Sequence, residues 1–227
     1  MVTVIAFDVN ETLLDLRALD PLFEELFGSA TLRPQWFAQM LQLSFVGGLT
    51  GHYVDFTTAQ KAALRMLAAR QGRSVSDHDV DAVVERMTSL PPHSEVPDAL
   101  SELAATGLTV VALTNSLQSV GEAQLVNAGI RHHFDRVISA DSVRSLKPAP
   151  EPYYSVASAY GTDISGVRLV AAHSWDVAGA LSAGCKAAFV ARPSMVLSPI
   201  GPPPDIVAVD IADVVQQIKT VDRQTPE

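Results

Sequence analysis

The 227-residue chain is predicted to be an α/β protein, in which a doubly wound parallel sheet carries an inserted domain of helices. A short apolar run at residues 2–7 is typical of a strand that is buried on both faces. Residues 15–88 then show helical periodicity with no good strand candidate, and strand and helix patterns alternate after residue 92. We therefore expect two domains, an α/β core of residues 1–14 and 92–227 and a helical cap of residues 15–91.

The cap is expected to contain about four helices. In the first two, apolar residues recur at helical spacing, as in residues 19–27 and 36–45. The third and fourth helices are expected over residues 53–70 and 76–90, and glycines between the segments mark their ends. Together these segments form one helical insert that directly follows the first strand.

The core is expected to continue with five more strands that alternate with helices, in the rhythm of βαβ units. The expected strands cover residues 108–113, 137–139, 167–172, 187–191 and 206–209. The expected helices cover residues 96–105, 120–128, 150–160, 177–183 and 211–221. In such sheets, ligands bind outside the carboxyl ends of the strands, so the residues just after each strand are the candidates for chemistry.

The composition limits the class of partner and the compartment. Sixteen Lys and Arg against 25 Asp and Glu give a net charge of −9, which repels phosphate backbones and anionic membrane surfaces. No apolar run reaches the roughly 18 residues of a membrane span, and the single Cys185 cannot form an intrachain disulfide. We expect a cytoplasmic protein whose partner is a small molecule and neither nucleic acid nor a membrane, and the apolar cap surface would allow a homodimer.

Asp8 leaves the first expected strand into a turn of polar side chains. A carboxylate at this place can be a nucleophile, because its attack on an electrophilic carbon or phosphorus would give an ester that water then cleaves. Aspartate is also common in turns for purely local reasons, so capping of the turn is the alternative role.

Small polar residues and a lysine follow the next two strands. Thr114, Asn115 and Ser116 can donate hydrogen bonds beside Asp8, or they can cap the helix that follows. Lys147 precedes a proline-stiffened helix start, where it can direct a fixed positive charge at a carboxylate, unless it is solvated.

The fourth strand ends in a polar segment that contains His173, Trp175 and Asp176. Asp176 can hold Lys147 in place, or it can accept a proton from the water that cleaves the ester. His173 can cap a helix or lie in the core, and the near-neutral pKa of an ordinary histidine also suits an acid or halide-facing role.

Taken together, these residues resemble the haloacid dehalogenase superfamily, which carries a nucleophilic aspartate, a small hydroxyl residue, a Lys-Pro pair and a strand-end aspartate in this order. The family has a Rossmann-like core with a cap domain, and within it the chain is most similar to the type II 2-haloacid dehalogenases. The resemblance implies that Asp8 is the nucleophile and that Thr12, Lys147 and Asp176 are catalytic. It places the following residues at the substrate: Asn10, Phe37, Thr114, Asn115, Tyr153, His173 and Trp175.

Two departures argue against a phosphatase of this superfamily. The phosphatases carry a second aspartate two residues after the nucleophile, which protonates the leaving alcohol, and here that position is Asn10. They also have two acidic residues around the polar segment that follows the fourth strand, for a magnesium site, whereas this chain has only Asp176 there. We therefore expect no metal and no other cofactor, and a leaving halide, which needs no proton.

The substrate pocket is expected to differ from that of the type II enzymes. Their arginine on the second cap helix, which grips the substrate carboxylate, is replaced by Phe37, and Arg33 or Arg17 can substitute for it. Ala171 and His173 replace a small polar residue and an asparagine. Four apolar residues of the cap are candidates for the wall of a pocket that takes a larger or more apolar substrate. Alternatively, they belong to the hydrophobic core of the cap. They are Phe37, Leu41, Leu43 and Phe45.

The leading hypothesis is a hydrolase in which Asp8 displaces halide from the carbon next to a carboxylate, and water then cleaves the aspartyl ester. The alternatives are a small-metabolite phosphatase of the same fold and a non-catalytic binding protein. Magnesium removal separates the dehalogenase from the phosphatase. An Asp8→Asn variant separates both enzymes from the binding protein.

Overall fold

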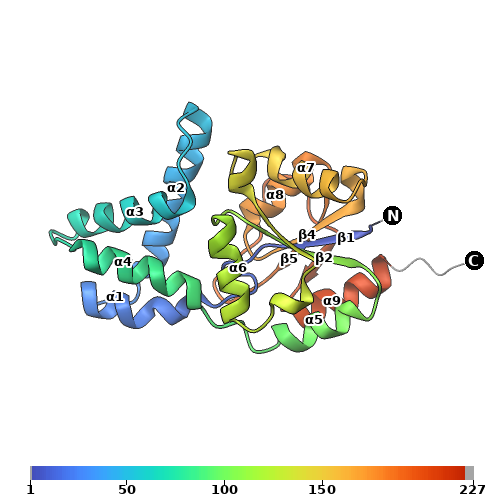
Figure 1. Cartoon of the computed structure of the whole chain (residues 1–227), viewed down its shortest axis with the longest axis horizontal. Helices are drawn as coiled ribbons and strands as arrows, with labels where there is room; N and C mark the ends of the chain where they lie inside the picture. The colour runs from blue at the N-terminus through green and yellow to red at the C-terminus, as the bar shows by residue number, and fades with distance from the viewer. Residues whose placement is uncertain (1, 223–227) are drawn as a thin grey trace, which may run out of the picture.

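The computed structural model describes residues 2–222 as a parallel sheet with helices on both faces and a further group of helices at one end (Figure 1). Met1 and residues 223–227, the end of the predicted core, lie outside the described residues. The strands are β1 (Val4–Phe7), β2 (Thr109–Thr114), β3 (Arg136–Ser139), β4 (Val167–Ala171), β5 (Lys186–Val190) and β6 (Ile206–Ala208). They pair in the order β3-β2-β1-β4-β5-β6, and every pair is parallel. The predicted doubly wound α/β class is confirmed.

Successive residues of β1 belong to two cores on opposite faces of the sheet. Ile5 and Phe7 pack into one core, while Val4 and Ala6 pack into the other. Since both faces are covered, all four residues are at most 1% exposed, which explains why the run is wholly apolar. The first core includes α5 (Val96–Ala104), α6 (Gln118–Asn127) and α9 (Ile211–Val221), and the second includes α7 (Pro150–Ala159) and α8 (Ser174–Ala183).

The helices between β1 and α5 form a separate group beside the sheet (Figure 1). They are α1 (Asp20–Phe27), α2 (Leu32–Thr50), α3 (Phe56–Arg70) and α4 (Asp77–Arg86). Local sequence sets their ends: α1 stops at Gly28, which has a left-handed φ of 71°, and Asp55 and Ser76 cap the starts of α3 and α4. The Trp36 indole N–H donates to the Gln60 carbonyl at 3.0 Å and joins α2 to α3.

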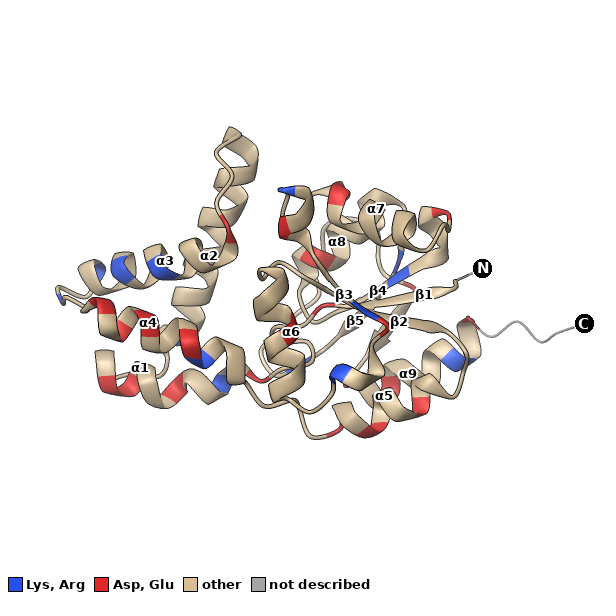
Figure 2. Cartoon of the chain, viewed as in Figure 1, with Lys and Arg blue, Asp and Glu red and all other residues tan. Residues whose placement is uncertain are grey.

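Basic residues of α3 and acidic residues of α4 lie on neighbouring helices (Figure 2), and two pairs of them form ion pairs. Lys61 lies 2.7 Å from Asp81, and Arg65 lies 2.6 Å from Asp77. Exposed pairs of this kind contribute at most about 1 kcal/mol each, so the buried apolar residues hold the cap together. Among residues 2–222, no helix combines the length and the hydropathy that a membrane span needs.

Several boundaries differ by a few residues from those that periodicity predicts, such as the start of α3 at Phe56 instead of residue 53. Helix α8 begins at Ser174 and not near Val177, because the extended His173 presents its carbonyl to the amides of Asp176 and Val177 at 3.1 Å. The fourth cap helix ends at Arg86 and continues as a 3-10 turn over Met87–Ser89. The earlier start of α8 places Asp176 in its first turn, at the carboxyl end of β4.

Candidate active site

The switch point of the sheet lies between β1 and β4, which are neighbours whose chain connections lead to opposite sides. This is where α/β sheets of this type bind ligands. Asp8 directly follows β1, and its amide donates to the Val170 carbonyl of β4 at 3.0 Å. His173 lies two residues beyond β4, so the two strand ends bring Asp8 and His173 together.

Three side chains donate hydrogen bonds to the Asp8 carboxylate. Lys147 Nζ lies 2.8 Å from Oδ1, while Thr12 Oγ1 and His173 Nδ1 lie 2.7 Å and 3.2 Å from Oδ2. Burial by itself raises the pKa of Asp8, but the Lys147 ammonium and His173 outweigh it and hold this pKa well below its usual range. The carboxylate is therefore ionised and fixed in direction, as a nucleophile requires.

Lys147 is fully buried between two carboxylates. Its Nζ lies 2.5 Å from Asp176 Oδ2 as well as 2.8 Å from Asp8 Oδ1. Burial lowers the pKa of Lys147, but the two carboxylates outweigh it and raise this pKa above the usual value. Burial raises the pKa of Asp176, against the pull of the ammonium and of the Tyr153 hydroxyl, which donates to Asp176 Oδ1 at 2.6 Å. Asp176 and Tyr153 thus fix the ammonium against Asp8.

Asn115 positions the backbone of Lys147. Its Nδ2 donates to the Lys147 carbonyl at 3.1 Å, and the Lys147 amide donates to Asn115 Oδ1 at 2.8 Å. Thr114 Oγ1 accepts from the Ser116 amide at 3.1 Å. Within the described residues, no hydrogen bond joins Thr114 or Asn115 to Asp8, so Asn115 acts on the nucleophile through Lys147.

Asn10 is buried beside the site, and its amide is held by other side chains. Gln124 Nε2 donates to Asn10 Oδ1 at 2.9 Å, and Asn10 Nδ2 lies 3.5 Å from Ser116 Oγ. An amide has no proton that it can transfer as an acid near neutral pH. Over residues 2–222, no group of three His, Cys, Asp or Glu side chains is arranged to hold a metal ion.

His173 is held by two aromatic rings and two carboxylates. Phe37 of α2 stacks on the imidazole at 5.7 Å and 18°, and Trp175 stacks on it at 5.1 Å and 29°. At the ring edge, Nδ1 contacts Asp8 and Nε2 lies 2.9 Å from Glu11 Oε2. Burial lowers the pKa of His173, but the hydrogen bonds to the two carboxylates outweigh it and raise this pKa to about 9. His173 is therefore an imidazolium at neutral pH.

Glu11 is a site residue that sequence reasoning missed. Its φ of 61° is left-handed, a conformation that residues other than glycine rarely adopt. This backbone directs its carboxylate to His173 and to Arg33, whose Nη1 lies 3.5 Å from Glu11 Oε1. Neither spacing nor residue type indicates this direction, since a glutamate in a polar turn ordinarily points to solvent.

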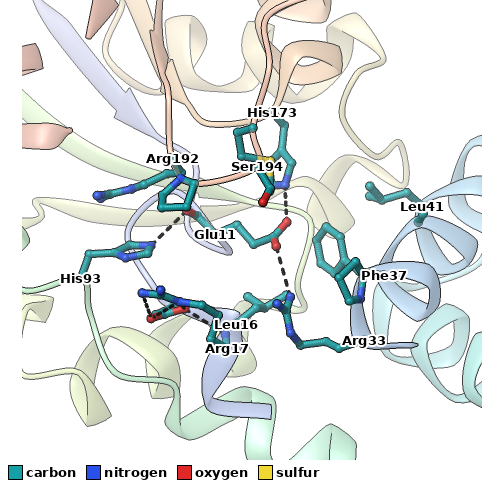
Figure 3. Close-up of a pocket in the computed structure, with 15 residues that line it drawn as sticks. Glu11, Leu16, Arg17, Arg33, Phe37, Leu41, His93, His173, Arg192 and Ser194 are labelled. Atoms are coloured by element: carbon teal, nitrogen blue, oxygen red, sulfur yellow. Dashed lines mark hydrogen bonds and ion pairs between the residues drawn. The ribbon is translucent and has the colours of Figure 1, made fainter. Parts of the chain in front are cut away.

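A cavity of about 310 Å³ opens beside the Glu11–His173 pair (Figure 3). Of the four predicted wall residues, Phe37 and Leu41 line this cavity. Phe45 lines a second cavity at the carboxyl end of α2, and Leu43 packs against the apolar core. Asp8 itself does not line the cavity and is 6% exposed, because His173 and Glu11 lie on that side.

The two arginines that the sequence offers as substitutes for the missing carboxylate clamp, Arg33 and Arg17, already pair with side chains of the protein. Arg33 Nε lies 2.6 Å from Asp20 Oδ1, and Arg17 contacts both oxygens of Asp15 at 2.7–2.9 Å. Both arginines line the cavity. Each is neutralised by a neighbouring carboxylate, so neither is a free bidentate clamp in this structure.

Comparisons with known proteins agree with this geometry. A family described as haloacid dehalogenase-like hydrolase matches residues 2–184. The (S)-2-haloacid dehalogenase of Pseudomonas sp. (strain YL) is 29% identical over 218 residues, which cover 95% of this chain and 94% of the relative. The (S)-2-haloacid dehalogenase of Xanthobacter autotrophicus is 30% identical over 194 residues, which cover 85% of this chain and 76% of the relative. A solved structure of L-2-haloacid dehalogenase from Xanthobacter autotrophicus matches with a TM-score of 0.91 and 25% identity over 97% of this chain and 100% of that one. The chain belongs to the haloacid dehalogenase-like hydrolases.

Proposed function

We propose that the protein is a 2-haloacid dehalogenase-like hydrolase, which cleaves a carbon–halogen bond next to a carboxylate. The observation that carries this proposal is the Asp8 carboxylate, kept ionised and oriented by Lys147, Thr12 and His173. The amide of Asn10 also supports this proposal, because an amide cannot supply the proton that a leaving alcohol needs, whereas a halide leaves without a proton. Similar proteins named (S)-2-haloacid dehalogenase point to the same reaction.

In the first step, an Asp8 oxygen attacks C2 of the substrate from the side opposite the halogen. The carbon–halogen bond breaks, and its electron pair leaves with the halide, so the centre inverts. In the second step, water adds to the Asp8 carboxyl carbon, and the bond from that carbon to the ester oxygen breaks. The products are a 2-hydroxy acid, a free carboxylate and one proton.

Lys147 has a role in both steps. Its ammonium keeps Asp8 ionised before attack, and it then stabilises the negative oxygen of the tetrahedral intermediate. Asp176, Tyr153 and Asn115 act as positioning residues, because they fix the ammonium and the backbone of Lys147.

The pocket favours 2-haloacids with an apolar substituent larger than hydrogen. Phe37 and Leu41 line the 310 Å³ cavity, and its arginines are already paired with carboxylates. The buried Trp175 Nε1 has no hydrogen-bond partner in the described part of the chain, but Trp175 does not line this cavity.

A small carboxylic acid is the partner that this reaction requires. The net charge of −9 disfavours nucleic acid, and the single buried thiol of Cys185 is consistent with a cytoplasmic protein. A homodimer is consistent with the exposed apolar side chains at the carboxyl end of α2, where Val46 and Leu49 are 49% and 88% exposed.

The test is halide release by the purified protein in EDTA, over fluoro-, chloro- and bromo-substituted 2-haloacids together with larger aryl and ester analogues. Asp8→Asn is the matched control, because it keeps the shape of the side chain and removes the nucleophile. We expect release by the wild type that is lost in the variant. If none of these compounds releases halide, the proposal is contradicted. Cleavage of phosphoesters after magnesium is restored would then identify a phosphatase.

A further inference from the structure

Arg192 is a buried cation that the mechanism above does not use. It lies two residues beyond β5, at the same edge of the sheet as Asp8, and lines the 310 Å³ cavity (Figure 3). Two groups hold its guanidinium: Nη1 lies 2.5 Å from Glu95 Oε1, while Nε and Nη2 donate to the Thr12 carbonyl at 3.2 Å and 2.8 Å. All three nitrogens contact the protein, so Arg192 is not a free clamp for the carboxylate of a substrate.

Thr12 connects Arg192 to the nucleophile. Its hydroxyl donates to Asp8 Oδ2 at 2.7 Å and accepts from the Ala172 amide at 2.9 Å. Threonine is branched at Cβ, so its χ1 has few allowed values and the direction of the hydroxyl follows the position of the backbone. Because Arg192 holds the carbonyl of the same residue, it sets the position from which the hydroxyl reaches Asp8.

The turn that carries Thr12 is also the point at which the chain leaves the core for the cap. Leu14 pairs with Pro92, so the two connections between the core and the cap run side by side. Arg192 contacts the first connection at Thr12 and the second at Glu95, and it joins both to the end of β5. It therefore fixes the turn to the sheet at the place where a movement of the cap would otherwise displace it.

We propose that Arg192 is a positioning residue for the first step of the reaction, an assignment that rests on the function proposed above. By holding the Thr12 carbonyl, it keeps the Thr12 hydroxyl on Asp8 Oδ2, and the carboxylate is aligned for attack on the substrate carbon. Without the guanidinium, the buried Thr12 carbonyl would lose both of these hydrogen bonds, which is costly. The turn would then move toward another donor, and the hydroxyl would leave Asp8.

Two other roles of Arg192 would give different kinetics. An arginine that binds substrate would change the substrate concentration at which the rate is half-maximal. An arginine that only stabilises the fold would change the free energy of unfolding and leave the rate of the folded protein unchanged. Positioning of the nucleophile instead lowers the rate at saturating substrate, because it acts on the chemical step.

The experiment mixes each variant rapidly with an excess of the 2-haloacid that the wild type cleaves fastest, and follows the first halide released per folded protein. This first phase reports the formation of the Asp8 ester. We expect Arg192→Met to slow it about 100-fold at saturating substrate, since a misplacement of about 1 Å costs a factor of this size. The substrate concentration of the half-maximal rate should stay within about twofold of the wild-type value.

Arg131→Met is the matched control. The Arg131 guanidinium also contacts a glutamate and a backbone carbonyl: Nε lies 2.5 Å from Glu122 Oε2, and Nη1 donates to the Phe134 carbonyl at 2.6 Å. Arg131 precedes β3, at the opposite edge of the sheet from Asp8. The control should therefore release its first halide at the wild-type rate.

A double-mutant cycle with Thr12→Val separates positioning from a structural role. Thr12→Val removes the hydroxyl, keeps the branched shape and should itself slow the first halide about 100-fold. If Arg192 acts through this hydroxyl, adding Arg192→Met to Thr12→Val should slow the release by less than about a further threefold. Independent effects would multiply instead, to a rate about 10,000-fold below that of the wild type.

Arg192→Lys is the second variant, in case Arg192→Met does not fold. Its ammonium keeps the positive charge beside Glu95, but it lacks the planar fork that gives the Thr12 carbonyl two hydrogen bonds. We expect the first halide to appear about tenfold more slowly than in the wild type, as an intermediate effect.

Three results would overturn the assignment. A wild-type rate in folded Arg192→Met or Arg192→Lys would show that Arg192 does not position the nucleophile. A raised half-saturating concentration with an unchanged saturated rate would make it a substrate-binding residue, and multiplied effects in the cycle would give it a role independent of Thr12. Failure of the wild type to release halide from any 2-haloacid would remove the proposed function itself, and this outcome is distinct because it involves no variant.

Discussion

Lys147 shows how much of the site depends on one buried charge. Its ammonium separates the carboxylates of Asp8 and Asp176, and all three side chains are at most 8% exposed. Without the ammonium, two buried negative charges would face each other. A buried ion pair that loses one partner typically costs 3–5 kcal/mol, because the remaining charge is left uncompensated.

We therefore predict that Lys147→Met lowers the free energy of unfolding by about 3–5 kcal/mol and abolishes halide release. Urea denaturation and a halide assay measure the two effects. Lys61→Met is the matched control, since Lys61 forms an exposed pair with Asp81 and should cost less than about 1 kcal/mol. Equal losses for the two variants would refute the proposed role of Lys147.

The charge on His173 gives a pH dependence of stability. Its folded pKa of about 9 lies above the unperturbed 6.5, so the folded state binds this proton more tightly than the unfolded state. The stabilisation is complete below pH 6.5 and is lost as the pH rises through 9, by up to about 3 kcal/mol. Unfolding free energies of wild type and His173→Gln should therefore converge between these pH values, and parallel curves would contradict this reading.

The sequence predicts some of these contacts and not others. Asp8 and Lys147 follow parallel strands, whose carboxyl ends must converge, so their proximity follows from the fold class. The direction of Glu11 depends on a single positive φ, and the contact of Asn115 with the Lys147 backbone depends on the path of a loop. The sequence therefore predicts neither the direction of the Glu11 side chain nor the contact of Asn115 with Lys147.

At the scale of elements, the close approach of α8 to the segment after Lys147 sets the position of the ammonium. Gly179 permits this approach, because a Cβ there would lie 2.6 Å from Pro148 Cβ and 2.7 Å from the Tyr153 hydroxyl. Periodicity predicted the body of α8 but started it near Val177, since its first turn is polar and carries the site. Polar functional residues in the first turn of a helix interrupt the apolar spacing, so this spacing does not predict where such a helix begins.

We predict that Gly179→Ala displaces Pro148 and Tyr153, lowers the free energy of unfolding by about 1–3 kcal/mol and reduces the rate of halide release. Gly48→Ala in α2 is the matched control, because nothing lies within 4 Å of its added Cβ. The control should raise stability by up to about 1 kcal/mol, through better helix propensity. Thermal unfolding of both variants measures the difference, and a neutral Gly179→Ala would contradict the packing argument.

At the scale of the whole molecule, the cap completes a site whose nucleophile lies on the core. Phe37 of α2 stacks on His173, which is 136 residues later in the chain, and the Tyr53 hydroxyl donates to Asp141 after β3. The change from strand to helix periodicity predicts that such a cap is present. It does not predict which cap residue meets which core residue, because that depends on the packing of the two parts.

The central claim is that Asp8 carries the substrate as a covalent ester, and a single turnover in water labelled with oxygen-18 tests it most directly. With protein in excess over a 2-haloacid, the 2-hydroxy acid formed should contain unlabelled oxygen from Asp8. One labelled oxygen should appear in the tryptic peptide of residues 1–17, which contains Asp8, and not in that of Asp8→Asn. Label found in the product of the first turnover would contradict the account, because water would then have attacked the substrate carbon directly.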